Sequence, residues 1–283
     1  MHSKIRINEI LSVYHNLLSS AKVLFIPFLI IAFCDSIALT LIYLAPRYPI
    51  SIILAPPIRK FWGEQFLHYP QNFSLIPRLF NYAHIFILFT LGIYFTGIFI
   101  KMCHIYFKTK KNILKVKVLI PSCIIAIKKF IPMVIFFAIF YSLTMYSFNL
   151  ISYLFDNLNL VNRFVKIAHL ASNFILVLFL QSIFAFMFPA LIVSNVGLIK
   201  AFKINFMLVF KNFWKILFVI FIPSILYALI TINKYFMPRL VEIYEPEVIV
   251  LSLGFGIFIT MLIDLFISGY TTVFYLLLNK DTL

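Results

Sequence analysis

Charged residues are scarce in this sequence, and their scarcity excludes a soluble globular protein. Only 12% of the 283 residues are charged, whereas 63% are hydrophobic. Soluble domains have about 25% charged and about 45–50% apolar residues. A chain of this length cannot bury so much apolar surface inside one globule. Lipid must solvate much of that surface, so the composition predicts a membrane protein.

Acidic residues, cysteines and catalytic motifs are also few. The chain has 9 Asp and Glu and 3 Cys, and it contains no GxSxG, HExxH, CxxC or Gly-rich phosphate loop. No carboxylate cluster has the spacing of a metal site. We therefore expect no enzymatic activity, no cofactor and no metal, and we expect Cys34, Cys103 and Cys123 to form no disulfide framework.

The excess of basic residues raises the question of whether the protein binds nucleic acid. The formal net charge is +15, from 24 Lys and Arg. Most of these residues flank apolar segments, and no water-soluble basic domain is present to read a nucleic acid. Anionic lipid headgroups attract basic residues by about 1 kcal/mol each near the membrane surface. We expect membrane lipids as partners, and no nucleic acid.

Six segments are apolar enough to cross a hydrocarbon core, which requires about 20 mostly apolar residues. They are Val23–Ala45, Ala83–Ile100, Phe130–Leu154, Val165–Val193, Ile216–Ile232 and Val248–Leu278. The sequence therefore predicts an all-α polytopic membrane protein with six transmembrane helices. It also predicts one membrane domain over residues 1–283, because no linker interrupts the chain.

One arrangement occurs three times: an amphipathic stretch, a lysine, and an apolar run with a proline near its start. The copies run from Ile7 to Lys22 and Pro27, from Lys115 to Lys129 and Pro132, and from Leu198 to Lys215 and Pro223. Each copy opens a pair of apolar segments. We expect three hairpins, each preceded by a cytoplasmic amphipathic interfacial helix, in repeats 1–100, 101–193 and 194–283.

Helical periodicity supports the surface helices. In the first copy, Ile10, Tyr14 and Leu17 share one apolar face, while polar residues take the other. Lysines that follow such helices, or form a stripe along them, can extend into the headgroup layer. The predicted headgroup contacts are Lys128, Lys129, Lys200, Lys203 and Lys211.

The distribution of Lys and Arg along the chain also predicts how the protein is oriented in the membrane. Lys and Arg favour the segments on the side of the N-terminus by about two to one, and the positive-inside rule then places both termini in the cytoplasm. The long outer segment Pro46–Tyr82 contains a stretch, Ile58–His68, that we expect to form a short interfacial helix. In that helix Trp62 and Phe66 would face lipid.

Two carboxylates fall in the middle of predicted spans. Asp35 lies in the first span and Asp264 in the sixth, where Thr260 and Ser268 lie on the same helical face as Asp264. A carboxylate at this depth costs about 2.5–3.5 kcal/mol on insertion scales, so each should face the bundle interior.

Two interpretations of this polar site stay open. It is a proton or cation relay in a transporter, or it is interhelical hydrogen bonding that closes the bundle. No Lys or Arg lies at that depth to pair with either carboxylate. His84 and His169 fall near the outer ends of spans, where we expect lone interfacial histidines rather than a pair that binds a metal.

Residues around the fourth and fifth spans carry a family resemblance. The stretch Phe188–Gly197 (FPALIVSNVG) is followed by Ala201, Asn205 and the run Phe210–Trp214 (FKNFW). It resembles a group of six-span bacterial proteins that includes YciC-like inner-membrane proteins. The same group includes the membrane domain attached to some glycerophosphodiester phosphodiesterases. The chain departs from the group at Ser194-Asn195, where an acidic residue usually precedes the glycine, and in its longer first outer segment.

The resemblance implies a fold and a bacterial inner-membrane location. It implies no catalytic residues, because chemistry in the two-part members belongs to a separate soluble domain. The expected function is a non-enzymatic multi-pass inner-membrane protein, in lipid handling or membrane organisation. The alternative is a small proton- or cation-coupled transporter or permease subunit that uses Asp35 and Asp264. Whether the chain forms a homo-oligomer or joins a membrane complex is open.

Overall fold

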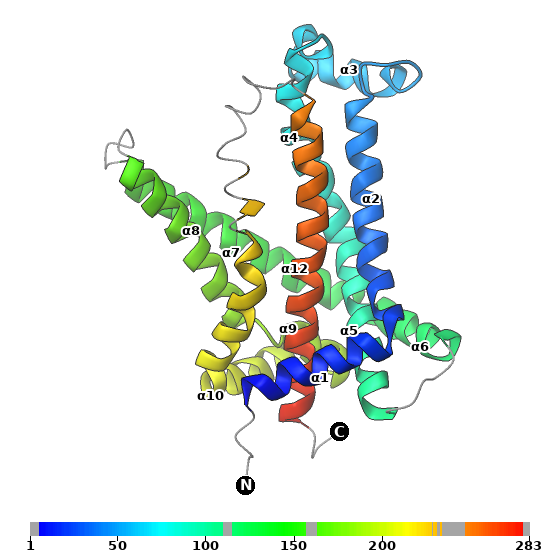
Figure 1. The fold of residues 1–283 in the computed structure, drawn as a ribbon, viewed down its shortest axis with the longest axis vertical. Coiled ribbons are helices and arrows are strands. Elements are labelled where there is room, and N and C mark those ends of the chain that lie inside the picture. Colours follow the sequence, from blue (N-terminus) through cyan, green and yellow to red (C-terminus); the bar gives the residue numbers. More distant parts are fainter. Residues whose placement is uncertain are drawn as a thin grey trace. The chain divides into compact units, whose positions relative to one another are not determined.

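The computed structural model describes residues 6–109, 115–156, 163–227, 229–230, 233 and 247–279, and these residues are almost entirely helical (Figure 1). The helices are α1 Ile7–Ser20, α2 Ile26–Tyr43, α3 Ser51–Phe61, α4 Gln71–Ile87, α5 Ile93–Thr109, α6 Lys115–Lys128, α7 Phe130–Asp156, α8 Arg163–Ile183, α9 Met187–Val193, α10 Leu198–Ser224 and α12 Val248–Leu278. Short 3-10 turns cover Lys22–Phe25 and Glu64–Leu67, and a π turn covers Leu88–Gly92. The predicted all-α fold is confirmed for the described residues.

Among the described residues, six helical segments are long and apolar enough to cross a membrane. They are Lys22–Tyr43, Gln71–Thr109, Phe130–Phe155, Ile167–Val193, Leu198–Ser224 and Val248–Leu278. The prediction of six such helices is confirmed. The predicted end of the fifth span, near Ile232, lies outside the described residues.

The helix that contains the predicted second span is longer than that span. The sequence placed the span at Ala83–Ile100, whereas helix α4 begins at Gln71 and includes Pro77. A proline inside a helix costs about 3 kcal/mol. Phe73, Ile76 and Phe80 are buried on one face of α4, and the burial of each such side chain stabilises the helix by about 1.5–3 kcal/mol. The stabilisation from burying these side chains therefore exceeds the cost of Pro77 in the helix.

Large apolar side chains cover the outside of these helices. Phe33 on α2, Phe86 on α4 and Leu251 on α12 are 65%, 69% and 74% exposed. Soluble monomers rarely expose contiguous apolar patches larger than a few hundred Å². The helices are therefore compatible with a multi-pass membrane protein whose spans are solvated by lipid.

The chain divides into two compact units, neither of which is continuous in sequence. The first unit contains residues 1–24, 93–224 and 266–283, and the second contains residues 25–92 and 225–265. We call them the first and second unit below. The repeat boundaries proposed from the sequence stay a prediction.

The second unit is organised around α2, α4 and the first part of α12. Its main hydrophobic cluster joins these three helices, with Leu39 from α2, Phe73, Ile76 and Phe80 from α4, and Ile249 and Ile257 from α12. A smaller cluster of Ala45, Ile58 and Leu75 holds the connection between α2 and α4. Trp62 and Phe66 pack against this smaller cluster. Both side chains are only partly buried, so the expectation that they also face lipid stays a prediction.

The first unit contains α1, α5 to α10 and the end of α12. A cluster of phenylalanines from α7, the connection after α8, and α10 packs edge to face, including Phe136, Phe184 and Phe202. Asn205 on α10 is fully buried in this unit. Its amide donates to the Ile183 carbonyl at 2.8 Å and accepts from the Phe186 N–H at 2.9 Å. Asn205 thus satisfies the backbone where the chain breaks between α8 and α9.

Helix α1 has the two faces that the periodicity predicted, but protein covers its apolar face. Ile10, Tyr14 and Leu17 are buried, while polar residues such as Asn8 and Asn16 are exposed. The Tyr14 ring packs on Phe266 and Tyr270 of α12, with ring centroids 6.2 and 4.9 Å away. In the third copy, α10 is interrupted at Asn212, whose φ of −130° and ψ of 16° are not helical. The helix therefore changes direction close to the residue where surface helix and span were expected to meet.

Candidate functional site

A buried ion pair lies in the second unit. Asp35 projects from the packed face of α2, on the same side as Ile31 and Leu39, and is only 3% exposed. The Nδ1 atom of His84, on α4, lies 3.1 Å from both carboxylate oxygens of Asp35. The interaction is an ion pair when His84 is protonated, and a hydrogen bond when the proton resides on Asp35. It is also a hydrogen bond when a neutral His84 donates its Nδ1–H to an ionised Asp35.

The local structure around the pair holds His84 in place. Helices α2 and α4 pack directly on each other, so residues that face the same contact meet. The His84 ring stacks on Phe80, one turn earlier on α4, with centroids 5.9 Å apart and planes 25° apart. A stacked ring has fewer accessible rotamers, so its Nδ1 atom stays directed at Asp35.

A second carboxylate completes the cluster. Asp264 on α12 is half-buried and lies close enough to both Asp35 and His84 for their charges to interact. Tyr227 is also within electrostatic range of Asp264. We call Asp35, His84 and Asp264 the polar cluster. It combines two carboxylates and one imidazole inside helices whose other side chains are mostly apolar.

The structure brings only some of the predicted site residues together. Asp35 and Asp264 lie in the same unit and interact, which the sequence left undecided. Thr260 is half-buried on α12, one turn before Asp264. Ser268 belongs to the first unit, where its backbone carbonyl accepts hydrogen bonds from the hydroxyls of Thr271 and Thr272.

His84 was the residue that sequence reasoning missed. It was interpreted as a lone interfacial histidine because the second span seemed to start at Ala83. His84 is not a lone side chain, since its Nδ1 atom lies 3.1 Å from both carboxylate oxygens of Asp35. The available signal was the apolar spacing of Phe73, Ile76 and Phe80, which continues to His84 at helical intervals.

The described residues contain no group of three His, Cys, Asp or Glu side chains placed to hold a metal ion. The three side chains of the polar cluster therefore do not form a coordination site in this arrangement. His169, in the first unit, lies 3.4 Å from Ser152 and from Asn173. Cys34, Cys103 and Cys123 are free thiols in this structure.

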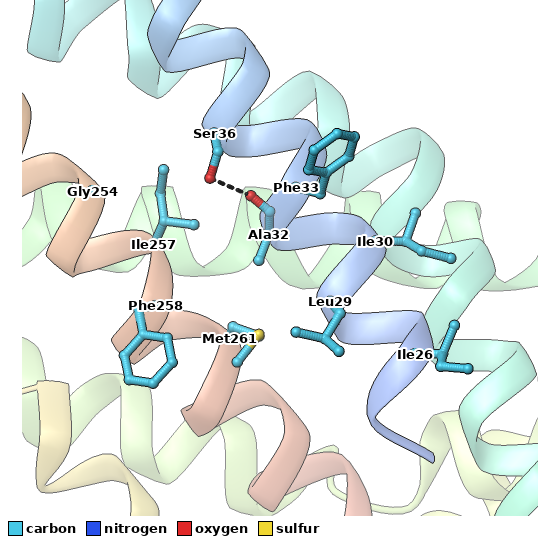
Figure 2. Close-up of a pocket in the computed structure, with 10 residues that line it drawn as sticks. All are labelled: Ile26, Leu29, Ile30, Ala32, Phe33, Ser36, Gly254, Ile257, Phe258 and Met261. Carbon is cyan, nitrogen blue, oxygen red and sulfur yellow. Dashed lines mark hydrogen bonds between the residues drawn. The ribbon is translucent and has the colours of Figure 1, made fainter. Parts of the chain in front are cut away.

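An apolar groove of about 510 Å³ lies between α2 and α12 in the second unit (Figure 2). Ten residues line it: Ile26, Leu29, Ile30, Ala32, Phe33, Ser36, Gly254, Ile257, Phe258 and Met261. Figure 2 shows Leu29 and Met261 pointing toward one another across it. Ser36 contributes the one side-chain hydroxyl, which donates to the Ala32 carbonyl at 2.8 Å. The lining thus suits an apolar chain.

The lysines predicted to contact headgroups fall into two groups. Lys128, Lys200, Lys203 and Lys211 are exposed. Lys129 is half-buried, and its ammonium donates to the Asn195 and Val196 carbonyls at 3.1 and 3.0 Å. Asn195 has a left-handed backbone with φ of 53°, so Lys129 stabilises the turn that follows α9. Its hydrogen bonds show a structural role that the sequence did not predict.

The arrangement defines the class of protein as an all-helical chain with six helices compatible with membrane spans and a buried polar cluster. Comparisons of this chain with protein families, with curated proteins and with solved structures found no match. The resemblance to the six-span bacterial group therefore stays a prediction.

Proposed function

We propose that this protein is a small proton-coupled membrane transporter and that the polar cluster is its proton-carrying site. The single observation that carries the proposal is the Asp35–His84 pair, buried inside candidate spans, with Asp264 in electrostatic range. Ionisable residues inside membrane helices are costly and usually mark a substrate or proton path. No reaction is assigned to the site.

The composition of the cluster favours a proton over a larger cation. Imidazole commonly exchanges a proton at functional sites, and here the His84 ring lies 3.1 Å from both carboxylate oxygens of Asp35. Two carboxylates in range of each other also resist ionising together. The cluster can therefore exist in states that differ by one proton and by one unit of buried charge. Such a pair of states is what coupling to a proton gradient requires.

The proposed placement is the bacterial inner membrane with both termini in the cytoplasm. The distribution of Lys and Arg supports this orientation. The surface helices and three-hairpin repeat form part of the same proposal.

Protonation of the cluster can be tested without knowing the substrate. The full chain would be reconstituted in lipid, and infrared difference spectra would be recorded while pH is varied across the physiological range. We expect a carboxyl band that appears on acidification, changes in His84→Gln, and is lost in Asp35→Asn or Asp264→Asn. Glu64→Gln is the matched control, because Glu64 is an exposed carboxylate of the same unit paired with Arg59 at 3.1 Å. A wild-type spectrum without such a band would overturn the proposal.

Transport itself needs a second assay. Proteoliposomes loaded with a pH-sensitive dye would be exposed to fractionated small-molecule extracts, and solute-dependent proton entry would be measured. Entry that Asp35→Asn abolishes and Glu64→Gln preserves supports a transporter. Proton entry that is equal in wild type and Asp35→Asn contradicts it.

A second candidate function, lipid handling without catalysis, is favoured by the groove between α2 and α12. Its lining is almost wholly apolar, and we propose that one acyl chain of a membrane lipid occupies it. A Cβ atom added at Gly254 would meet nothing within 4 Å, so Gly254→Leu should fold and fill the groove. Native mass spectrometry should then show fewer retained lipids than in wild type. Equal retention would remove the support for this function.

A further inference from the structure

Large apolar side chains line one exposed side of helix α10. Ile199, Met207 and Phe210 are all exposed, and their spacing of i, i+8 and i+11 places them within a quarter turn of one another on the helix. Trp214 follows just beyond the interruption at Asn212. Phe210 and Trp214 are 81% and 78% exposed. We call Ile199, Met207, Phe210 and Trp214 the exposed α10 face.

The opposite side of the helix is packed against the first unit. Ala201, Asn205 and Val209, at positions i, i+4 and i+8, are buried. Asn205 also holds the backbone between α8 and α9 through its two hydrogen bonds. Rotation of α10 about its axis would break these contacts. The fold of the first unit therefore keeps the exposed α10 face directed away from the protein.

Three lysines accompany this face. Lys203 lies within it, Lys200 and Lys211 lie along one edge, and all three are exposed. Glu9 is the one acid among the described side chains of the first unit, and it lies on α1. Neither of the two ion pairs found in the described part of the chain involves these lysines. The surface is therefore apolar and positively charged at the same time.

Neither water nor the hydrocarbon core accommodates such a surface. In water, the large apolar side chains would form an exposed patch, which soluble proteins rarely leave uncovered. In the hydrocarbon core, the three lysines would lose their contact with water, which is strongly disfavoured at the centre of a span. At the boundary between headgroups and acyl chains, aromatic rings pack on the first methylene groups while ammonium groups reach the phosphates. An anionic headgroup also supplies the negative charge that this side of the protein lacks.

We propose that the exposed α10 face docks on the headgroup layer of anionic phospholipids. Phe210 and Trp214 insert just below the phosphates, and the three lysines contact the phosphates. The interruption at Asn212 allows the rest of α10 to leave the plane of the interface. The inference requires that the chain lies in a membrane, but it does not depend on the proposed proton site, whose residues belong to the second unit. Its failure would leave the infrared test of the polar cluster unaffected.

Trp214 itself provides the readout, because the chain has only two tryptophans. The full chain with Trp62→Phe, in which Trp214 is the single tryptophan, would be reconstituted in bilayers of equal parts phosphatidylglycerol-type and phosphatidylcholine-type lipid. Its fluorescence would be quenched separately by iodide in water, by lipid brominated early in the acyl chain, and by lipid brominated near the chain end. Each bromine label would be placed on the anionic lipid or on the zwitterionic lipid.

Two lysine variants test the charge of the surface in the same background. Lys203→Gln removes a charge from the exposed α10 face. Lys128→Gln is the matched control, because it removes the same charge from an exposed lysine on α6 of the same unit. Both side chains are exposed, so neither substitution should disturb folding.

We expect the label early in the acyl chain to quench Trp214 most strongly. The brominated anionic lipid should be preferred over the zwitterionic one by about fivefold or more, since a single lysine near an anionic surface already contributes about that much. Lys203→Gln should lower this preference by about twofold or more, and Lys128→Gln should leave it unchanged.

Four results would overturn the proposal. Quenching mainly by iodide would place the exposed α10 face in water, and quenching mainly by the chain-end label would place it in the hydrocarbon core. Protection from all quenchers would show that another protein surface, such as a second copy of the chain, covers it. Equal preference for the two lipids, or equal loss of preference in Lys203→Gln and Lys128→Gln, would show that the surface does not select anionic lipid. If Trp62→Phe does not fold, the difference between wild type and Trp214→Phe gives the same quenching profile.

Discussion

Removal of His84 should reveal how strongly the Asp35–His84 pair holds the second unit together. Asp35 is 3% exposed, so His84→Ala leaves a buried carboxylate without its partner. Breaking a buried ion pair in this way costs about 3–5 kcal/mol. That destabilisation has three parts: the lost Asp35–His84 interaction, the penalty of an unpaired buried charge, and the lost stacking of His84 on Phe80. The single variant therefore cannot measure the pair alone.

A double-mutant cycle isolates the interaction. The free energy of unfolding would be measured for wild type, Asp35→Ala, His84→Ala and the double variant, by reversible denaturation in mixed micelles. Neutral hydrogen bonds between membrane helices average about 0.6 kcal/mol and reach about 1.7 kcal/mol in such cycles. Hydrogen bonds to charged groups contribute about 1.5–3 kcal/mol. His84 Nδ1 is 3.1 Å from both oxygens of Asp35, and water is largely excluded. We expect a coupling energy above about 2 kcal/mol.

The size of that coupling decides between the two interpretations left open by the sequence. A value above about 2 kcal/mol indicates a charged, proton-sharing pair, as the proposed function requires. A value near 0.6 kcal/mol indicates ordinary hydrogen bonding between helices. If the two single effects add within about 0.5 kcal/mol, Asp35 and His84 are independent, and the reasoning from their geometry is refuted.

Two further predictions concern the first unit. Asn205→Leu leaves the Phe186 N–H and the Ile183 carbonyl buried without partners, so it should lower the free energy of unfolding by about 1–3 kcal/mol per group. Thermal unfolding in detergent measures this change. An unchanged unfolding midpoint would show that the backbone break does not depend on Asn205. Gly269→Ala would place a Cβ atom in steric conflict with the Tyr14 ring, so α1 should detach and become sensitive to protease. The Gly269→Ala, Tyr14→Ala double variant should partly recover. Equal protease sensitivity of Gly269→Ala and wild type would contradict this contact.

Much of the fold followed from local properties of the sequence. The number of long apolar helices depends on segment length and composition, and six were found among the described residues as expected. The faces of α1 follow from the spacing of its apolar residues, and Ile10, Tyr14 and Leu17 on the predicted apolar face are buried. What those faces contact was not predicted. Periodicity indicates that a face is apolar, but it does not distinguish lipid from protein.

The second helical segment shows where local signals mislead. The sequence assigned the region before Ala83 to an outer segment, Pro46–Tyr82, between two spans. The helix forms there because Phe73 and Ile76 are buried in a cluster with residues of α2 and α12. Those partners are distant in sequence, so no local window contains them.

The sequence by itself determined that the chain is helical, apolar and basic, and that Asp35 and Asp264 are its two mid-span carboxylates. These conclusions rest on composition and on hydrophobic length, which a linear chain already contains. The tertiary structure alone decided that His84, 49 residues away, is the partner of Asp35. It also decided which side of α10 is buried, at Ala201 and Val209, and which side is exposed, at Phe210 and Trp214. Both facts depend on which helix faces meet, and packing sets that only after the chain folds.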